Sequence, residues 1–203
     1  MRVLPSGSTA LLVELADLDE VLGVYAALHG APPPGVVEIV PAARTVLLVV
    51  DPTRTTLGAV ESAVRATTPR IGDRSTGDLV ELPVVYDGAD LDDVADLLGC
   101  DRSEVVRRHT EDEWTVAFCG FAPGFGYMTS SSGQWRIARR ESPRTKVPPG
   151  SVGLAGEFSG VYPRESPGGW QLIGRTDLQV FDLHRDPPAL LSPGTRVRFV
   201  EAR

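Results

Sequence analysis

The C-terminal half of the chain is punctuated by glycine and proline, beginning with FCGFAPGFGYM at residues 118–128. Two similar segments follow, SPRTKVPPGSVGLAG at residues 142–156 and YPRESPGGWQLIGRT at residues 162–176. Short apolar or alternating runs accompany them and predict strands. Many short strands separated by tight turns are typical of a closed or nearly closed β-barrel. The predicted strands of this region cover residues 114–121, 170–173, 178–183 and 196–200.

The residues before this region predict a strand and two short helices. Residues 79–86 are rich in apolar and β-branched residues, which predicts a strand at the start of the barrel unit. A helix is expected to begin at Asp90, and another at Asp101, because Asp101 and Glu104 have the spacing of a capping box.

The first seventy residues predict a small α+β unit. Apolar residues recur at helical spacing from Leu18, with Asp17 as the expected N-cap and Gly30 just past the end. A second helix is expected from Leu57, capped by Thr55 or Thr56. With strands at residues 10–15, 36–40 and 45–50, the order is most of a ferredoxin-like split βαβ pattern.

Residues 69–78 are polar and contain glycine, so we place a domain boundary there. The expected fold class is an α+β, ferredoxin-like domain at residues 1–76, followed by a mainly-β barrel domain at residues 77–203.

Composition excludes several functional classes. The 203 residues carry a formal net charge of −7, which argues against nucleic acid as the main partner. No apolar run approaches the length of a membrane span, and the first residues do not resemble a signal peptide, so a cytoplasmic location is expected. Cys100 and Cys119 form no CxxC pair, so we expect neither a zinc site nor a disulfide.

The first glycine-rich segment is a candidate binding loop. Gly120 and Gly124 leave backbone N–H groups open to a ligand, Pro123 lies between them, and the neighbouring aromatic residues can form pocket walls. The alternative is a barrel turn that is packed by its own aromatic residues.

The second segment suggests an anion site. Arg144 and Lys146 are separated by one residue, so in an extended chain both side chains point the same way. The glycine-spaced run after them offers amides that could form an anion nest. With Arg175 from the third segment, the cations are expected to form one pocket for a phosphate or a carboxylate. The alternative is that Arg144 braces the loop against a carboxylate such as Glu157.

His109 ends a basic helix and precedes three acidic residues. It could act as a general base or phosphate contact, or it could simply interact with the helix C-terminus. We name His109, Arg144 and Glu157 as candidate catalytic residues. The candidate substrate- or ATP-binding residues are Gly120, Pro123, Gly124, Lys146, Gly150, Ser151, Gly156 and Arg175.

Together the three segments resemble one bacterial family, whose members are known as the B subunit of 5-oxoprolinase, the first subunit of allophanate hydrolase or a sporulation-kinase inhibitor. The similarity runs from about residue 4 to residue 199. The resemblance implies a small α+β N-terminal domain and a cyclophilin-like barrel. It also implies that the chain is one component of a hydrolase and is inactive, or nearly so, by itself. The implied partners are a longer protein with a related barrel and a third protein.

The implied reaction is the ATP-dependent opening of 5-oxoproline to glutamate. A lactam carbonyl is a poor electrophile, so phosphorylating its oxygen creates a good leaving group before water attacks. ATP would be a co-substrate, with Mg²⁺ bound through the nucleotide, and which of the three proteins holds it stays open. Hydrolysing allophanate would need an amidase domain, which this chain lacks. The competing functions are inhibition of a sensor histidine kinase and, by fold analogy alone, prolyl isomerisation.

Overall fold

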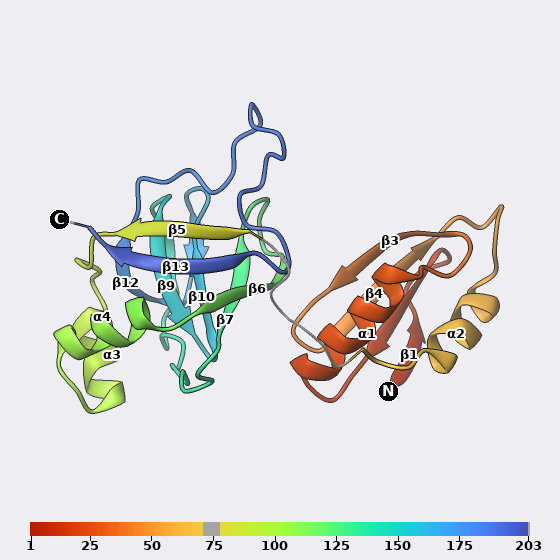
Figure 1. Cartoon of the computed structure of the whole chain (residues 1–203), viewed down its shortest axis with the longest axis horizontal. Helices are drawn as coiled ribbons and strands as arrows, with labels where there is room; N and C mark the ends of the chain where they lie inside the picture. The colour runs from red at the N-terminus through yellow and green to blue at the C-terminus, as the bar shows by residue number, and fades with distance from the viewer. Residues whose placement is uncertain (71–77, 203) are drawn as a thin grey trace. The chain divides into compact units, whose positions relative to one another are not determined.

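The computed structural model describes residues 1–70 and 78–202 (Figure 1). Contacts divide the chain into two compact units, Met1–Arg74 and Ser75–Arg203. The expected boundary between residues 76 and 77 lies outside the described residues. The part of the chain that the structure describes holds no helix long and apolar enough to cross a membrane.

The N-terminal unit is a four-stranded antiparallel sheet with two helices. The strand order is β1-β2-β4-β3, so β4 lies between the two strands that α1 connects. This is the expected split βαβ arrangement. The sequence analysis did not predict β1, which pairs with β2 at the edge of the sheet. The elements are β1 (Arg2–Pro5), β2 (Ala10–Glu14), α1 (Leu18–Gly30), β3 (Val36–Pro41), β4 (Thr45–Val50) and α2 (Leu57–Ala66).

The helices of this unit begin where their caps predict. The Asp17 side chain accepts a hydrogen bond from the backbone N–H of Glu20 at 2.9 Å, and the Thr56 hydroxyl accepts one from that of Ala59 at 3.2 Å. The expected C-terminal stop of α1 was wrong by one residue, because Gly30 lies inside the helix and Ala31 is its C-cap.

The C-terminal unit is a seven-stranded, nearly closed barrel with two helices and a separate two-stranded sheet. The barrel order is β12-β9-β10-β7-β6-β13-β5, and β11 pairs with β8. The elements are β5 (Leu79–Val84), α3 (Leu91–Leu98), α4 (Arg102–Glu111), β6 (Trp114–Cys119), β7 (Gly126–Ser130), β8 (Arg144–Val147), β9 (Ser151–Ala155), β10 (Phe158–Val161), β11 (Ser166–Gly168), β12 (Gln171–Arg175) and β13 (Arg196–Glu201).

One bridge joins the two edges of the barrel sheet. Val85, just after β5, and Arg175, at the end of β12, each donate a backbone N–H to the other's carbonyl, both at 2.9 Å. This antiparallel bridge joins the first and last strands of the order above. The predicted barrel architecture is therefore confirmed, and the third segment supplies one side of the closure.

The strand expected at residues 178–183 was wrong. In this stretch only an isolated bridge between Phe181 and Ala189 forms. Val180 and the nearby Leu191 are nevertheless buried in the barrel core. The apolar composition of this stretch thus reflects a loop that packs into the core, not a strand in the ladder.

The barrel interior is filled by large apolar side chains from every side of the sheet. Trp114, Met128, Leu154, Ile173 and Phe199 are all essentially inaccessible to solvent. α3 and α4 contact each other and pack against β12 and β13 respectively (Figure 1). Both cysteines are free thiols, in agreement with the expected absence of a disulfide.

Candidate functional site

The first glycine-rich segment forms a tight turn between β6 and β7 whose hydrogen bonds are internal. The Gly120 amide donates to the Phe125 carbonyl at 3.2 Å, and the Phe125 amide donates to that of Ala122 at 3.0 Å. Gly124 is needed because a side chain there would lie 2.4 Å from the Phe181 Cβ atom. At the tip Phe121 is 56% exposed, with a left-handed backbone, and Pro123 is exposed.

Aromatic side chains behind this turn form a second, smaller core. The Phe125 ring lies between those of Tyr162 and Trp170, with centroids 5.3 and 5.2 Å away. Gly160 makes room for this packing, since a Cβ atom there would come within 3.0 Å of both Phe125 and Trp170. The structure therefore supports the alternative interpretation of the first segment for most of its aromatic residues, and leaves only Phe121 facing solvent.

The anion nest expected from the second segment is not formed. Residues 151–155 are β9, a strand with neighbours on both sides, so its amides are used by the sheet. The Gly150 amide donates to the Tyr162 carbonyl at 2.7 Å, and the Gly156 amide to that of Ile137 at 2.6 Å. Ser151 is buried at the start of the strand. The expectation failed because a central strand leaves no row of free N–H groups.

Gly150 instead has a structural requirement that can be tested. It has a φ of +77°, and a Cβ atom there would lie 2.2 Å from the Thr176 carbonyl oxygen. Gly156 has a φ of +59° with nothing within 4 Å of the same position. We expect Gly150→Ala to lower the free energy of unfolding by about 1–2 kcal/mol more than Gly156→Ala. Urea denaturation of both variants measures this, and equal losses would contradict it.

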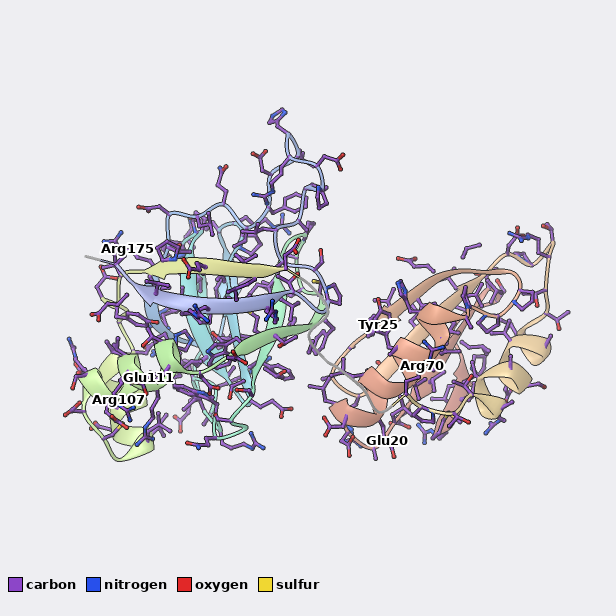
Figure 2. The ribbon with its side chains drawn as sticks, in the orientation of Figure 1. Glu20, Tyr25, Arg70, Arg107, Glu111 and Arg175 are labelled. Atoms are coloured by element: carbon purple, nitrogen blue, oxygen red, sulfur yellow. The ribbon has the colours of Figure 1, made fainter. Side chains whose placement is uncertain are left out.

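The three cations expected in one pocket pair with three different carboxylates. The Lys146 side chain is 75% exposed, with its ammonium 3.2 Å from Glu165. Arg175, at the end of β12, donates from Nε to Asp87 at 3.0 Å (Figure 2). The proposed brace between Arg144 and Glu157 is also absent, because Glu157 lies 4.0 Å from Arg136. The three cations thus belong to three separate ion pairs.

Arg144 belongs to a different cluster, built around a buried carboxylate. Asp90 is 1% exposed and accepts hydrogen bonds from Arg144 Nη2 at 2.7 Å and Arg140 Nη1 at 2.5 Å. Its second oxygen accepts the Leu172 amide at 2.7 Å. Asp90 therefore joins the start of α3, the chain entering β8, and β12. We call Asp90, Arg140, Arg144 and Gln171 the Asp90 cluster.

The Asp90 cluster carries a net positive charge. Burial alone raises the pKa of Asp90, but the hydrogen bonds from Arg144 and Leu172 and the charges of both arginines outweigh it and lower that pKa. The carboxylate is thus ionised at neutral pH, and two guanidinium groups share one negative charge. The side chains of Arg140 and Arg144 are 31% and 23% exposed, so both reach the surface.

The cluster also contains unused hydrogen-bonding capacity. Arg140 Nε, Arg144 Nη1 and Gln171 Oε1 are the buried side-chain atoms without a partner in the described part of the chain. Buried polar groups are usually paired, so these three unpaired atoms are available to bind a ligand. A pocket of about 600 Å³ adjoins Arg140 and Gln171. It is lined by Asp93, Asp96, Leu97, Arg140, Glu141, Ser142 and Gln171.

His109 is part of the core. Its side chain has no exposed surface, and its ring contacts the Tyr86 hydroxyl through Nδ1 at 2.8 Å and the Ser159 hydroxyl through Nε2 at 3.1 Å. Burial lowers its pKa to about 3, against a smaller opposing effect of the Asp112 charge. The imidazole is therefore neutral, and this position supports neither the phosphate contact nor the proton transfer considered for it.

The sequence analysis missed three of the four cluster residues. Asp90 is predicted only as the start of a helix, yet its side chain makes no capping hydrogen bond in α3. Arg140 precedes the second segment, and Gln171 lies inside the third without a distinguishing neighbour. Only a contact between residues 54 positions apart, Asp90 and Arg144, reveals the site.

Comparison with known proteins decides the family. Residues 1–191 match the family described as carboxyltransferase domain, subdomain C and D. The chain belongs to this family. It is 43% identical to the B subunit of 5-oxoprolinase from Escherichia coli O157:H7 over 171 residues, which are 82% of this chain and 78% of that protein. It is 46% identical to the B subunit of 5-oxoprolinase from Bacillus subtilis (strain 168), over 60% of this chain and 52% of that one.

Solved structures are also similar to this chain. TTHA0988 superposes with a TM-score of 0.78 at 35% identity, over 96% of this chain and 40% of that chain. The chain thus spans about half the length of the Bacillus relative and less than half of TTHA0988. The resemblance drawn from the three segments is confirmed at the level of the family.

The residues of this carboxyltransferase-domain chain do not fit ATP at the glycine run where it was expected. The amides of Gly150 and Gly156 are used within the fold, as described above. Among residues 1–70 and 78–202, no group of three His, Cys, Asp or Glu residues could hold a metal ion.

Proposed function

We propose that the chain is the B subunit of a heteromeric 5-oxoprolinase, which opens the lactam of 5-oxoproline to glutamate with ATP as co-substrate. The observation that carries the proposal is the 43% identity to such a protein across most of both chains. A longer partner with a related barrel and a third protein would complete the enzyme. The ATP site belongs, in this proposal, to one of those partners.

Within that enzyme the Asp90 cluster would bind the substrate. 5-Oxoproline presents a carboxylate and a lactam N–H. Two guanidinium groups sharing one carboxylate can hold a further anion, and Arg presents forked donors that match a carboxylate. Gln171 Oε1, which has no partner, could accept an N–H. The pocket beside Arg140 and Gln171 is also lined by Asp93, Asp96 and Glu141, which suits a ligand bearing both an anion and a donor.

Arg144→Ala tests this role in the reconstituted complex. Losing one charged hydrogen bond to the substrate, about 1.5–3 kcal/mol, should lower kcat/KM for 5-oxoproline at least tenfold, mainly through KM. Stability also falls, because Asp90 loses one of its two arginines. Activity is therefore measured per folded molecule, below the unfolding transition.

The matched control is Arg198→Ala. Arg198 is a half-exposed arginine of β13 that lies 3.7 Å from Glu81 on the same barrel. It should leave both kinetic constants unchanged. A normal KM in Arg144→Ala would remove the Asp90 cluster from substrate binding, whereas co-expressed proteins that never associate would reject the 5-oxoprolinase proposal itself.

A further inference from the structure

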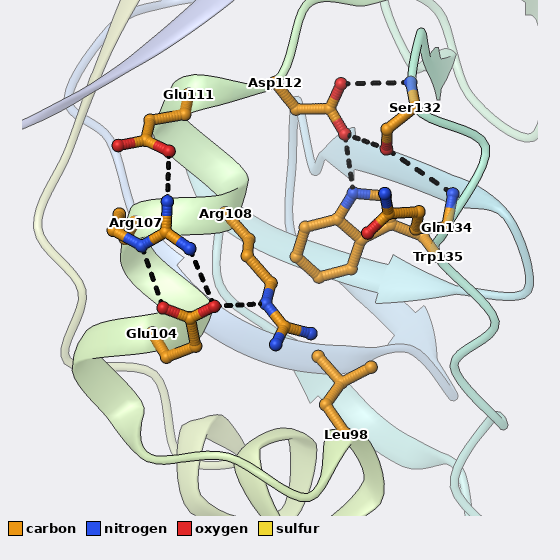
Figure 3. Close-up of a pocket in the computed structure, with 9 residues that line it drawn as sticks. All are labelled: Leu98, Glu104, Arg107, Arg108, Glu111, Asp112, Ser132, Gln134 and Trp135. Carbon is orange, nitrogen blue, oxygen red and sulfur yellow. Dashed lines mark hydrogen bonds and ion pairs between the residues drawn. The ribbon is translucent and has the colours of Figure 1, made fainter.

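A second pocket lies beside the helical pair of the barrel unit, between α4 and residues 132–135 (Figure 3). Its volume is about 450 Å³, within the range of small-molecule sites. It shares no lining residue with the pocket of the Asp90 cluster. Its lining residues are Leu98, Glu104, Arg107, Arg108, Glu111, Asp112, Ser132, Gln134 and Trp135.

Two consecutive arginines of α4 differ in how their donors are used. Every guanidinium nitrogen of Arg107 is engaged: Nε and Nη2 donate to Glu104, both at 2.8 Å, and Nη1 donates to Glu111. Arg108 donates only from Nε, to Glu104 at 2.6 Å. In the described part of the chain, its Nη1 and Nη2 have no hydrogen-bond partner. Figure 3 shows this free end of Arg108 directed between Leu98 and Trp135.

The walls beside the Arg108 guanidinium are apolar and fixed. Trp135 is 3% exposed, and its indole N–H donates to Asp112 at 3.1 Å, which sets the orientation of the ring. Leu98 is half-buried and packs against the barrel core. The walls beside the guanidinium are thus apolar, which suits a flat apolar group whose polar end lies on the guanidinium.

The carboxylates of the pocket already have hydrogen-bond partners. Glu104 is shared by both arginines, and their hydrogen bonds lower its pKa to about 2. Asp112 accepts hydrogen bonds from Ser131, from both the amide and hydroxyl of Ser132, and from Trp135. The Nη1 and Nη2 groups of Arg108 are therefore the strongest donors left open, and their forked geometry matches the two oxygens of a carboxylate.

We propose that this pocket binds a small monocarboxylate with a flat apolar body, held by Arg108 between Leu98 and Trp135. The site is independent of the Asp90 cluster and of the proposed 5-oxoprolinase activity. The C-terminal carboxylate of a protein has the same chemistry. The experiment therefore distinguishes a free small molecule from a protein C-terminus as the ligand.

The test follows the indole N–H signal of Trp135 by NMR while benzoate is added to the full-length protein. We expect a saturable shift in the wild type, none with the neutral isostere benzamide, and binding weakened at least tenfold in Arg108→Gln. Arg107→Gln is the matched control, because all three guanidinium nitrogens of Arg107 already donate to Glu104 and Glu111, and it should bind benzoate as the wild type does. Arg108→Lys, which keeps the charge but not the fork, should also bind more weakly.

A second titration uses N-acetylphenylalanine, which mimics a protein C-terminus. Tighter binding than benzoate assigns the pocket to a chain terminus, and weaker binding assigns it to a free small carboxylate. The proposal is overturned if neither compound shifts the Trp135 signal, if benzamide binds as well as benzoate, or if Arg107→Gln loses binding while Arg108→Gln retains it.

Discussion

Asp90→Ala is expected to lower the free energy of unfolding by about 3–5 kcal/mol, because it leaves two partly buried arginines without their shared carboxylate. Arg140 and Arg144 both depend on this one side chain, and the Leu172 amide loses its acceptor at the same time. Urea denaturation followed by circular dichroism measures the loss.

Asp93→Ala is the control for this prediction. Asp93 is an exposed acidic residue on the first turn of the same helix, so its removal should change stability by no more than about 0.5 kcal/mol. Asp90→Asn separates charge from hydrogen bonding, since an amide oxygen can still accept from Leu172. If Asp90→Ala and Asp93→Ala are equally stable, the Asp90 cluster does not hold β12 and α3 together.

A loss of stability of about 3 kcal/mol is expected between pH 7 and pH 4.5 from His109 alone. The folded pKa is about 3, below the unfolded value of about 6.5, so in this interval the unfolded chain binds a proton that the folded chain excludes. The contribution of His109 to the free energy of unfolding is complete above pH 6.5. Below that pH it falls by about 1.4 kcal/mol per pH unit. Asp90, with its lowered pKa, contributes only at more acidic pH.

The measurement is the free energy of unfolding at half-unit pH steps, for the wild type and for His109→Gln. The variant is less stable at pH 7, because it loses a buried ring that packs against Trp114, Trp135 and Phe199. The slope of its unfolding free energy between pH 6.5 and 4.5 should nevertheless be smaller, by the uptake of about one proton. His184→Gln, at an exposed loop position, should keep the wild-type slope. An unchanged slope in His109→Gln would show that the imidazole is protonated without unfolding.

The sequence by itself determined most of the secondary structure of this protein, because helix caps and apolar spacing involve only residues a few positions apart. Helical spacing and the Asp17, Thr56 and Asp101 side chains placed the starts of three helices, and alternation or β-branching placed most of the longer strands. Glycine and proline spacing indicated the barrel, and the three segments indicated the family. The same signals failed at residues 178–183, where apolar side chains enter the core from a loop.

The tertiary structure alone decided which charges meet. Arg144, Lys146 and Arg175 looked equivalent along the chain, yet each pairs with a carboxylate from another segment, and only Arg144 finds a buried one. His109 looked available at a helix end, but the barrel covers it. The amino-acid sequence specifies the residue types and their local spacing. Burial and long-range pairing, which set the pKa and reach of each group, arise only when β12, α3 and the chain before β8 come together.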